Sequence, residues 1–421
     1  MFPYCPKTRL HDPSLPFSWI ALSFLSASAG GFQSGPQSAR TLGMGGASTA
    51  YIRDLAVIYY NPGALAQLDS LTHVSVGGLA NMRRTSFLGT DSRRLADQEL
   101  SPLPGGYLYA SHAINDKVSV GLSVNTPYGY DTRWPSDWEG RSVVQQARLN
   151  TLFVQPTASV KINENFSIGA GFVYAFGKMT QQYALGQYDA RDVTAQFTGT
   201  GSGMGYNVGL YGKTADKLAF GISYRSPVTL KVKDGKATYN NVPALDAGRY
   251  APSAKLRTEF NMPGALAVGM ADNVTKKLLV TFDFTLSAWS RYDSLTFNVG
   301  DAPGLATRTA GRRYEDAMAF RVGGEYAYSD MFTFRVGASY DETPIRDEFI
   351  TPDLPDGNKL GGSLGVSVFF SPKLSVDAAY QYEHAADRTS RANQSKSSVN
   401  SVGGTYRTRV HTAALGLSYS F

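Results

Sequence analysis

The end of the chain alternates strictly between two kinds of side chain. From Leu415 to Phe421 every second residue is apolar, and only glycine or serine lies between them. A period of two is typical of a β-strand whose two faces meet different surroundings. A strand with one apolar face, ending the chain on an aromatic residue, is typical of a bacterial outer-membrane β-barrel.

The same period of two recurs from about Leu71 onward. From Ile168 to Phe176 apolar residues share one face, and mainly glycine and alanine occupy the other. The stretch from Phe332 to Tyr340 repeats this alternation, with Arg335 on the second face. An arginine that faced lipid at the bilayer midplane would cost roughly 2–4 kcal/mol. We therefore assign the face of Arg335 to a polar lumen.

Counting such segments predicts about fourteen strands, joined alternately by short turns and long loops. The predicted strands start near Leu71, Gly105, Val118, Arg148, Phe166, Gly203, Leu218, Thr258, Leu278, Met318, Phe332, Gly361, Leu374 and Thr405. Short periplasmic turns and long external loops are typical of outer-membrane barrels, and an open sheet edge in lipid would leave backbone groups unpaired. We therefore predict an all-β fold, in which residues 71–421 form a transmembrane antiparallel β-barrel in the outer membrane.

Residues 30–70 lack this alternation. They contain short helical segments broken by glycine, and the run Asn61–Pro62–Gly63 forces a turn. So short a segment buries too little apolar surface to fold alone, so we predict a helical hatch inside the barrel lumen. Residues 1–29 are predicted to be a signal peptide, because positive charges precede the apolar stretch from Phe17 to Leu25 and small residues follow it.

Composition and charge argue against several other classes of protein. Mean hydropathy is only −0.21, and no run of about 18 apolar residues follows the leader, so we expect no transmembrane helix in the mature chain. The net charge of +6 is small, and no basic block with interleaved aromatic residues indicates nucleic-acid binding. The mature histidines are scattered singly along the sequence. We therefore expect no metal, no cofactor and no enzymatic activity.

A series of short motifs runs in order along nearly the whole mature chain. The motifs are Gly31–Gln33, Ser38–Gly46, Asn61–Pro62, Pro127–Gly129, Trp138–Arg141, Asn207–Gly209, Tyr224–Ser226, Ala288–Ser290 and Arg335–Pro344. In their order and spacing they resemble the FadL family of outer-membrane transporters for long-chain fatty acids and other hydrophobic compounds. The resemblance implies a fourteen-stranded barrel plugged by an N-terminal hatch, in agreement with the strand count.

The resemblance also implies a route for the ligand. Outer loops capture a hydrophobic molecule, an apolar pocket above the hatch binds it, and it leaves sideways through the barrel wall at a kinked third strand. That strand is predicted from Val118 to Asn125, with Gly121 as the candidate for the kink because glycine weakens a strand. An ordinary bend of the barrel at Gly121 is the alternative. Asn61, Pro62 and Gly63 lie at the hatch motif of the family and are expected to take part in gating.

Three aromatic residues are candidates for ligand binding. Phe32 matches a family position near the mature N-terminus that reaches into the pocket. Trp134 and Trp138 lie in a predicted outer loop, where ligand capture takes place in the family. The other aromatic residues at strand ends are better explained by the interfacial girdles found in such barrels.

The end of the predicted fifth strand bears on the substrate. Phe176, Lys178 and Gln181 are further ligand-binding candidates, and Gln181 stands where fatty-acid-binding members carry an arginine. A carboxylate buried without a partner costs several kcal/mol. An acid ligand would therefore need Lys178, unless it enters protonated. A lysine that faces the lumen without a ligand role is the alternative for Lys178.

The sequence thus predicts transport of a hydrophobic small molecule, with a long-chain fatty acid as the preferred substrate. We expect a monomer surrounded by outer-membrane lipid. Uptake of aromatic hydrocarbons by a channel of the same family is the alternative within transport. A general porin for polar solutes and a surface receptor that uses the long loops are the rivals outside it.

Overall fold

The computed structural model describes residues 30–69, 71–185, 193–214, 217–246, 253–300, 307–390 and 402–421. The signal peptide predicted for residues 1–29 lies outside the described residues. Within the described part of the chain, no helix is long and apolar enough to cross a membrane.

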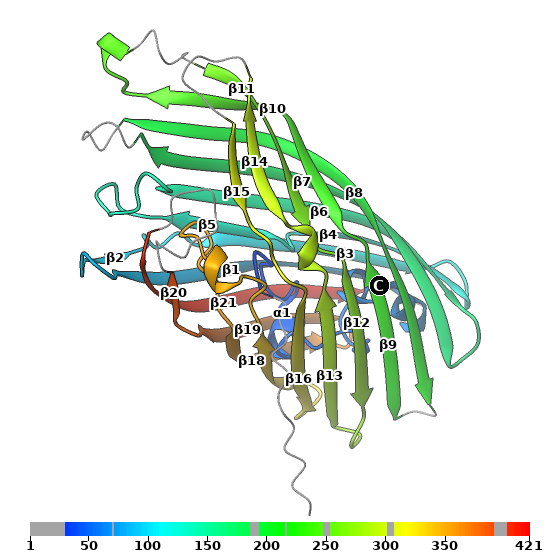
Figure 1. Ribbon diagram of the computed structural model, residues 1–421. Helices are drawn as coiled ribbons and strands as arrows, with labels where there is room; N and C mark the ends of the chain where they lie inside the picture. The colour runs from blue at the N-terminus through cyan, green and yellow to red at the C-terminus, as the bar shows by residue number, and fades with distance from the viewer. Residues whose placement is uncertain are drawn as a thin grey trace, which may run out of the picture.

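The strands form one closed antiparallel barrel with fourteen strand positions, as predicted (Figure 1). The barrel closes because β1 pairs with β3 on one side and with the last strand, β21, on the other. In order around the wall the positions are β1 (Thr72–Gly89), β3 (Leu103–Ala113), β4 with β5 (Val118–Asn125, Gly129–Arg133), β6 (Gln146–Lys161), β7 (Phe166–Ala184), β8 (Thr194–Thr214), β9 with β10 (Leu218–Arg225, Val228–Asn240), β12 with β11 (Ala265–Asp272, Ser253–Met262), β13 with β14 (Leu278–Ser287, Ser294–Val299), β16 with β15 (Ala317–Ala327, Arg308–Gly311), β17 (Phe332–Asp341), β18 (Lys359–Ser371), β19 (Leu374–Ala385) and β21 (Gly404–Ser420). Two short segments, β2 (Leu95–Asp97) and β20 (Arg388–Ser390), extend the hairpins on the loop side.

The two faces of the wall follow the alternation in the sequence. On β7 the apolar residues from Phe166 to Phe176 are exposed at every second position, whereas Val173 and Ala175 between them are buried. Ten residues of a strand tilted by about 40° rise roughly 25 Å, which is the height of the apolar band of an outer-membrane barrel. Arg335 of β17 lies on the inner face, as predicted, where it pairs with Glu325 at 2.8 Å.

The hatch lies inside the barrel and appears in blue in Figure 1. It contains α1 (Ala39–Gly43), α2 (Val57–Tyr60) and the 3₁₀ helix η1 (Pro62–Gln67). Asn61 caps η1 with its side chain, which accepts the Gly63 N–H at 3.1 Å, and Pro62 occupies the first helical position. The amide of Asn61 also donates to the carbonyls of Thr49 (2.9 Å) and Leu210 (3.0 Å), so this residue ties the hatch to β8.

Glycines of the inner wall let the hatch backbone approach the strands closely. We call these eight glycines, each on a different strand, the glycine ring. A Cβ added at any of them would overlap or crowd hatch atoms: Gly209 would meet Asn61, Gly337 would meet Gly45, and Gly169 would meet Pro62. The ring consists of Gly121, Gly169, Gly209, Gly221, Gly269, Gly323, Gly337 and Gly365.

Ion pairs and charge-assisted hydrogen bonds add to this backbone contact. Arg40 of the hatch pairs with Asp377 of β19 at 3.0 Å, and Arg53 pairs with Glu325 at 2.9 Å. Asp283 of β13 accepts the N–H groups of Ser48 and Thr49 at 2.7 and 2.8 Å. Charged side chains inside the barrel are therefore used to hold the hatch in place.

Candidate functional site

The third strand position is interrupted. Its lower part, β4, pairs with β3 as far as Asn125 opposite Tyr107, and its upper part, β5, begins at Gly129. On β6, Asn125 lies opposite Phe153 and Gly129 lies opposite Asn150. The three residues 126–128 between them therefore face only two residues of β6. This is a β-bulge, which bends a strand and ends its regular pairing.

The break weakens the wall between the third strand position and β3. Pro127 has no N–H to donate. The Gly106 N–H of β3 donates to the hydroxyl of Thr126 at 3.2 Å and not to a backbone carbonyl of the third strand. Among the described residues, backbone hydrogen bonding on the β3 side of the third strand resumes only above the break, where the Glu99 N–H donates to the Arg133 carbonyl. A small cavity lies at the break, lined by β1, β3, β6 and the residues that enter the lumen behind it.

The predicted kink position differs from the observed break. Gly121 pairs regularly with Ser111 of β3 and Thr157 of β6, so the ladder continues through it and the placement of the kink at Gly121 was wrong. Gly121 belongs to the glycine ring instead, where a Cβ would crowd Ile58 of α2. Gly121 lies beside the hatch, and its role in gating remains a prediction.

The first described residues cover the break from inside the barrel. We call Gly30–Ser34 the N-terminal segment. It adds a short antiparallel stretch to the third strand: the Gly129 N–H donates to the Phe32 carbonyl (2.9 Å), and the Ser34 N–H donates to the Pro127 carbonyl (3.0 Å). Between these two bonds Gln33 lies directly opposite Tyr128. The N-terminal segment thus supplies the pairing that β3 does not.

Phe32 of this segment sits within a box of aromatic rings. Its ring centroid lies 4.8 Å from Trp289, 5.5 Å from Tyr292, and 6.1 Å from both Tyr128 and Tyr130. Phe32 is 2% exposed, and the box belongs to a large apolar cluster above the hatch. We call this cluster the aromatic chamber.

Gln181 lies at the edge of the aromatic chamber. It lines a small cavity together with Phe297, which belongs to the chamber, and with Arg308 of β15. Arg312 also lines this cavity, but a buried pair with Asp353 already neutralises its charge. Arg308 stacks over the ring of Tyr183 at 4.1 Å, and no carboxylate of the described residues lies within 4.0 Å of it. Position 181 is a glutamine and carries no charge, so Arg308 can supply the cation at this cavity.

A family model described as outer membrane protein transport protein (OMPP1/FadL/TodX) matches residues 20–421 of the chain. The chain belongs to the OMPP1/FadL/TodX family. Its members are outer-membrane transport proteins, so the predictions of an outer-membrane location, a barrel that carries hydrophobic compounds and a protein without enzymatic activity are confirmed.

Relatives of this FadL-family chain differ in what their names say they carry. The long-chain fatty acid transport protein of Salmonella typhi is 26% identical, with 87% of this chain and 90% of the relative covered. A Pseudomonas aeruginosa FadL homologue matches with a TM-score of 0.78 at 20% identity, over 93% of this chain and 99% of that one. The Pseudomonas putida toluene transporter TodX matches with a TM-score of 0.70 at 17% identity, over 92% and 98%. The two solved structures show the fold alone.

Phe176 and Lys178 do not face the lumen of this FadL-family barrel. Both are exposed on the outer face of β7, whereas Gly177 and Met179 between and beside them face the aromatic chamber. The assignment of Lys178 as a lumenal cation was therefore wrong. Lys178 is the next outward-facing residue after Phe176, where the apolar band ends. A lysine at this level is expected to lie among the lipid headgroups.

Trp134 and Trp138 are stacked on each other, with ring centroids 4.5 Å apart, and both are 3% exposed. Their indole N–H groups donate to the carbonyls of Pro352 (3.0 Å) and Val144 (2.8 Å). They lie in the wall of the aromatic chamber on the loop side and not on an exposed loop surface. Capture of ligand by this pair remains a prediction that would require the loops to move.

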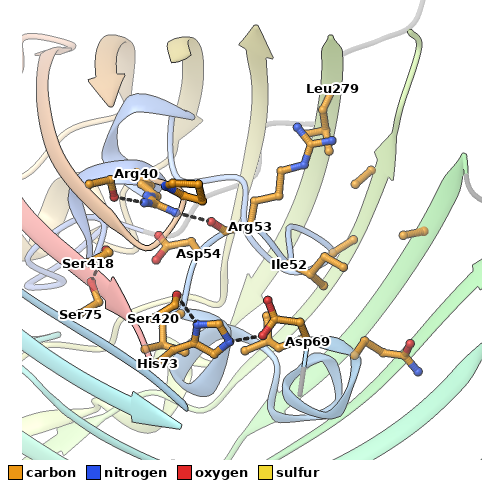
Figure 2. Close-up of a pocket in the computed structure, with 18 of the residues that line it drawn as sticks. Arg40, Ile52, Arg53, Asp54, Asp69, His73, Ser75, Leu279, Ser418 and Ser420 are labelled. Carbon is orange, nitrogen blue, oxygen red and sulfur yellow. Dashed lines mark hydrogen bonds and ion pairs between the residues drawn. The ribbon is translucent and has the colours of Figure 1, made fainter. Parts of the chain in front are cut away.

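A third and larger cavity, of about 530 Å³, lies on the other side of the hatch, beside the short turns (Figure 2). Hatch residues Arg40, Arg53 and Asp54 line it together with His73 of β1, which bonds Asp69 and Ser420. Apolar side chains, among them Ile52 and Leu279, make up much of the remaining lining. The cavity is therefore a vestibule at the periplasmic end in which charged and apolar side chains are mixed.

The N-terminal segment is anchored to the loop between β17 and β18. The Gly31 N–H donates to the carboxylate of Asp356 at 2.8 Å, and Lys359 pairs with the same side chain at 3.1 Å. Burial alone would raise the pKa of Asp356, but the Lys359 ammonium, then the Arg83 guanidinium and the Gly31 N–H, hold this pKa below its usual value. The ionised form is therefore favoured in the folded protein.

We expect acid to weaken this anchor. Because the pKa of Asp356 is lower in the folded protein than in the unfolded chain, its contribution to stability is complete above the ordinary pKa of about 4 and is lost as the pH falls below it. Asp356→Asn should cost about 3 kcal/mol at pH 7, since it leaves buried cations unpaired. Thermal unfolding between pH 7 and pH 2 checks this: the Tm difference between wild type and variant should shrink on acidification. A constant difference would contradict it.

Proposed function

We propose that this protein takes up long-chain fatty acids, with the alkyl chain in the aromatic chamber and the carboxylate at Arg308. The observation that carries the proposal is a half-buried arginine, free of any described carboxylate, at the edge of an apolar cluster. A guanidinium binds a carboxylate through two parallel hydrogen bonds. The fatty-acid carriers among the relatives support the same substrate class.

We propose further that the ligand leaves sideways through the break at residues 126–128. Phe32 fills the aromatic box, and its neighbours Gln33 and Ser34 cover the break, so one displacement of the N-terminal segment empties the box and uncovers the wall. Moving Phe32 out of the box exposes its side chain at a cost of roughly 1.5–3 kcal/mol, which a buried alkyl chain offsets at about 0.8 kcal/mol per CH₂.

A specific observation also favours the aromatic-hydrocarbon alternative. The aromatic box around Phe32 already surrounds one six-membered ring with four others. A monoaromatic guest would reproduce these edge-to-face contacts after Phe32 moves away, without any need for a cation. The two substrate classes therefore differ in their dependence on Arg308.

We expect Arg308→Gln to separate the two. Loss of a charge-assisted hydrogen bond of about 1.5–3 kcal/mol should lower oleate uptake by at least tenfold and leave toluene uptake unchanged. The assay is labelled uptake in a host that lacks its own transporter, with both substrates tested in parallel. Arg291→Gln, which removes an exposed arginine on the outer face, is the matched control. Unchanged oleate uptake in Arg308→Gln, or toluene uptake alone in the wild type, would sink the fatty-acid proposal.

A further inference from the structure

Three basic side chains stand side by side on the outer face of the barrel. Arg84 of β1 lies directly opposite Arg409 of β21, and Arg409 lies directly opposite His384 of β19. All three are exposed, although their neighbours along the same strands face inward. Arg83, next to Arg84, points into the lumen and lies 3.6 Å from Asp356. We call Arg84, Arg409 and His384 the basic row.

The basic row lies at the upper edge of the apolar band. Arg409 lies ten residues before Tyr419, which is near the periplasmic end of β21, and ten residue steps rise roughly 25 Å in a tilted strand. Directly below the row the outer surface carries Tyr380 and Tyr382, with His411 between them, and the Tyr380 hydroxyl bonds His411 Nδ1 at 2.6 Å. Aromatic residues of this kind mark the interface between hydrocarbon and headgroups. The row therefore lies at the headgroups of the outer leaflet.

The arrangement of the two arginines is unfavourable in the protein alone. Side chains directly opposite on antiparallel strands have Cβ atoms about 5 Å apart, and like charges in such a pair destabilise the sheet. Within the described part of the chain, no carboxylate lies within 4.0 Å of Arg84 or Arg409. Arg407, one outward position higher on β21, differs because Asp387 pairs with it at 2.8 Å. Asp387 thus supplies an anionic partner for Arg407, whereas the described residues supply no such carboxylate for the two arginines of the basic row.

We propose that the basic row binds the phosphate group of a phosphorylated lipid in the outer leaflet of the membrane. Two adjacent guanidinium groups present several N–H donors in the planar geometry that matches phosphate oxygens. A membrane lipid fits better than a soluble phosphate, because the apolar surface below the row, including Ala413 and Leu415, continues where the acyl chains would lie. The site is separate from the aromatic chamber, since it lies on the opposite face of the wall.

The proposal can be tested on the full chain in a nonionic detergent. The probe is lipid A, a phosphorylated glycolipid, and retention of lipid on the folded barrel is measured by native mass spectrometry. Arg84→Gln/Arg409→Gln should weaken lipid A binding by at least about tenfold, as expected for the loss of charge-assisted hydrogen bonds. Lipid A stripped of its phosphates should bind the wild type as weakly as lipid A binds the variant.

The control removes the same charge elsewhere. Lys236 and Lys255 are another pair of directly opposed, exposed cations, on β10 and β11. Lys236→Gln/Lys255→Gln should leave lipid A binding unchanged, and an equal loss in this variant would overturn the proposal in favour of general charge attraction. Competition by millimolar inorganic phosphate as strong as that by lipid A would also overturn it. If the arginine variant does not fold, as judged by heat-modifiable migration on a gel, Arg84→Lys/Arg409→Lys replaces it and should still lose affinity.

Discussion

A disulfide between positions 33 and 128 should abolish uptake, and reduction should restore it. Gln33 and Tyr128 face each other in an antiparallel pair that is flanked, but not joined, by backbone hydrogen bonds. Such non-hydrogen-bonded pairs have Cα atoms about 4.5 Å apart, which lies within the range that a disulfide bridges. The sequence contains one cysteine, Cys5, in the predicted leader, so Gln33→Cys/Tyr128→Cys would introduce the reactive pair of the mature protein.

The expected result follows from the two tasks of the N-terminal segment. Fixed to the third strand, it can neither take Phe32 out of the aromatic box nor uncover residues 126–128. Oleate uptake by the oxidised variant should fall to the level of the empty vector, and a reductant should restore it in the same cells. Thr85→Cys/Thr408→Cys, which joins β1 to β21 where their hydroxyls already meet at 3.0 Å, is the control for oxidation. Full uptake by the oxidised Gln33→Cys/Tyr128→Cys protein would refute lateral exit at this break.

Gly209→Val should turn the closed barrel into an ion-conducting pore. A side chain at this position of the glycine ring would occupy the space of the Asn61 carboxamide, whose bonds to Thr49 and Leu210 hold the hatch. Overpacking costs about 1–3 kcal/mol, and each lost hydrogen bond adds about 1 kcal/mol. These costs favour a displaced hatch, and the lumen behind it is lined by ionic groups that water readily hydrates.

The measurement is conductance in planar bilayers. We expect the wild type to show rare, small openings and Gly209→Val to show frequent openings that are larger by about tenfold or more. Gly362→Val on β18 is the matched control, because a Cβ at Gly362 has no other atom within 4 Å. It should conduct like the wild type. Large openings in the wild type itself would instead support the general porin that the sequence left as a rival.

The strands could be predicted from the sequence because the two faces of each one meet different solvents. Lipid outside and a polar lumen inside impose a period of two that neighbouring strands do not alter. Most of the fourteen strand positions begin near their predicted starts, but β8 begins at Thr194, well before the predicted start near Gly203. The same logic assigned Arg335 to the lumen. At the end of β7 the period of two places Lys178 on the same outward face as Phe176. The lumenal assignment of Lys178 came from the resemblance to the family and departed from this alternation.

The site was harder to predict because chain segments far apart in sequence build it. Phe32 meets Trp289 and Tyr292, which lie some 260 residues later in the chain. Arg308 and Gln181 line one cavity although β15 and β7 are not neighbours in the wall. The break could have been placed from the sequence, since Pro127 lacks an N–H group and sits in a motif already noted. The glycine at position 121 indicated a bend as well, because a residue without a side chain weakens a strand. Its contact with Ile58 shows that the missing side chain makes room for the hatch.

The position of Phe32 has a consequence for the permeability of the cell envelope. The residue that occupies the aromatic box and the residues that cover the break are consecutive in the chain. Under the proposed lateral exit, an unloaded protein is therefore also a sealed one, and a solute that does not fit the box would not open the wall. Selectivity would then be exercised at the exit as much as at the point of binding.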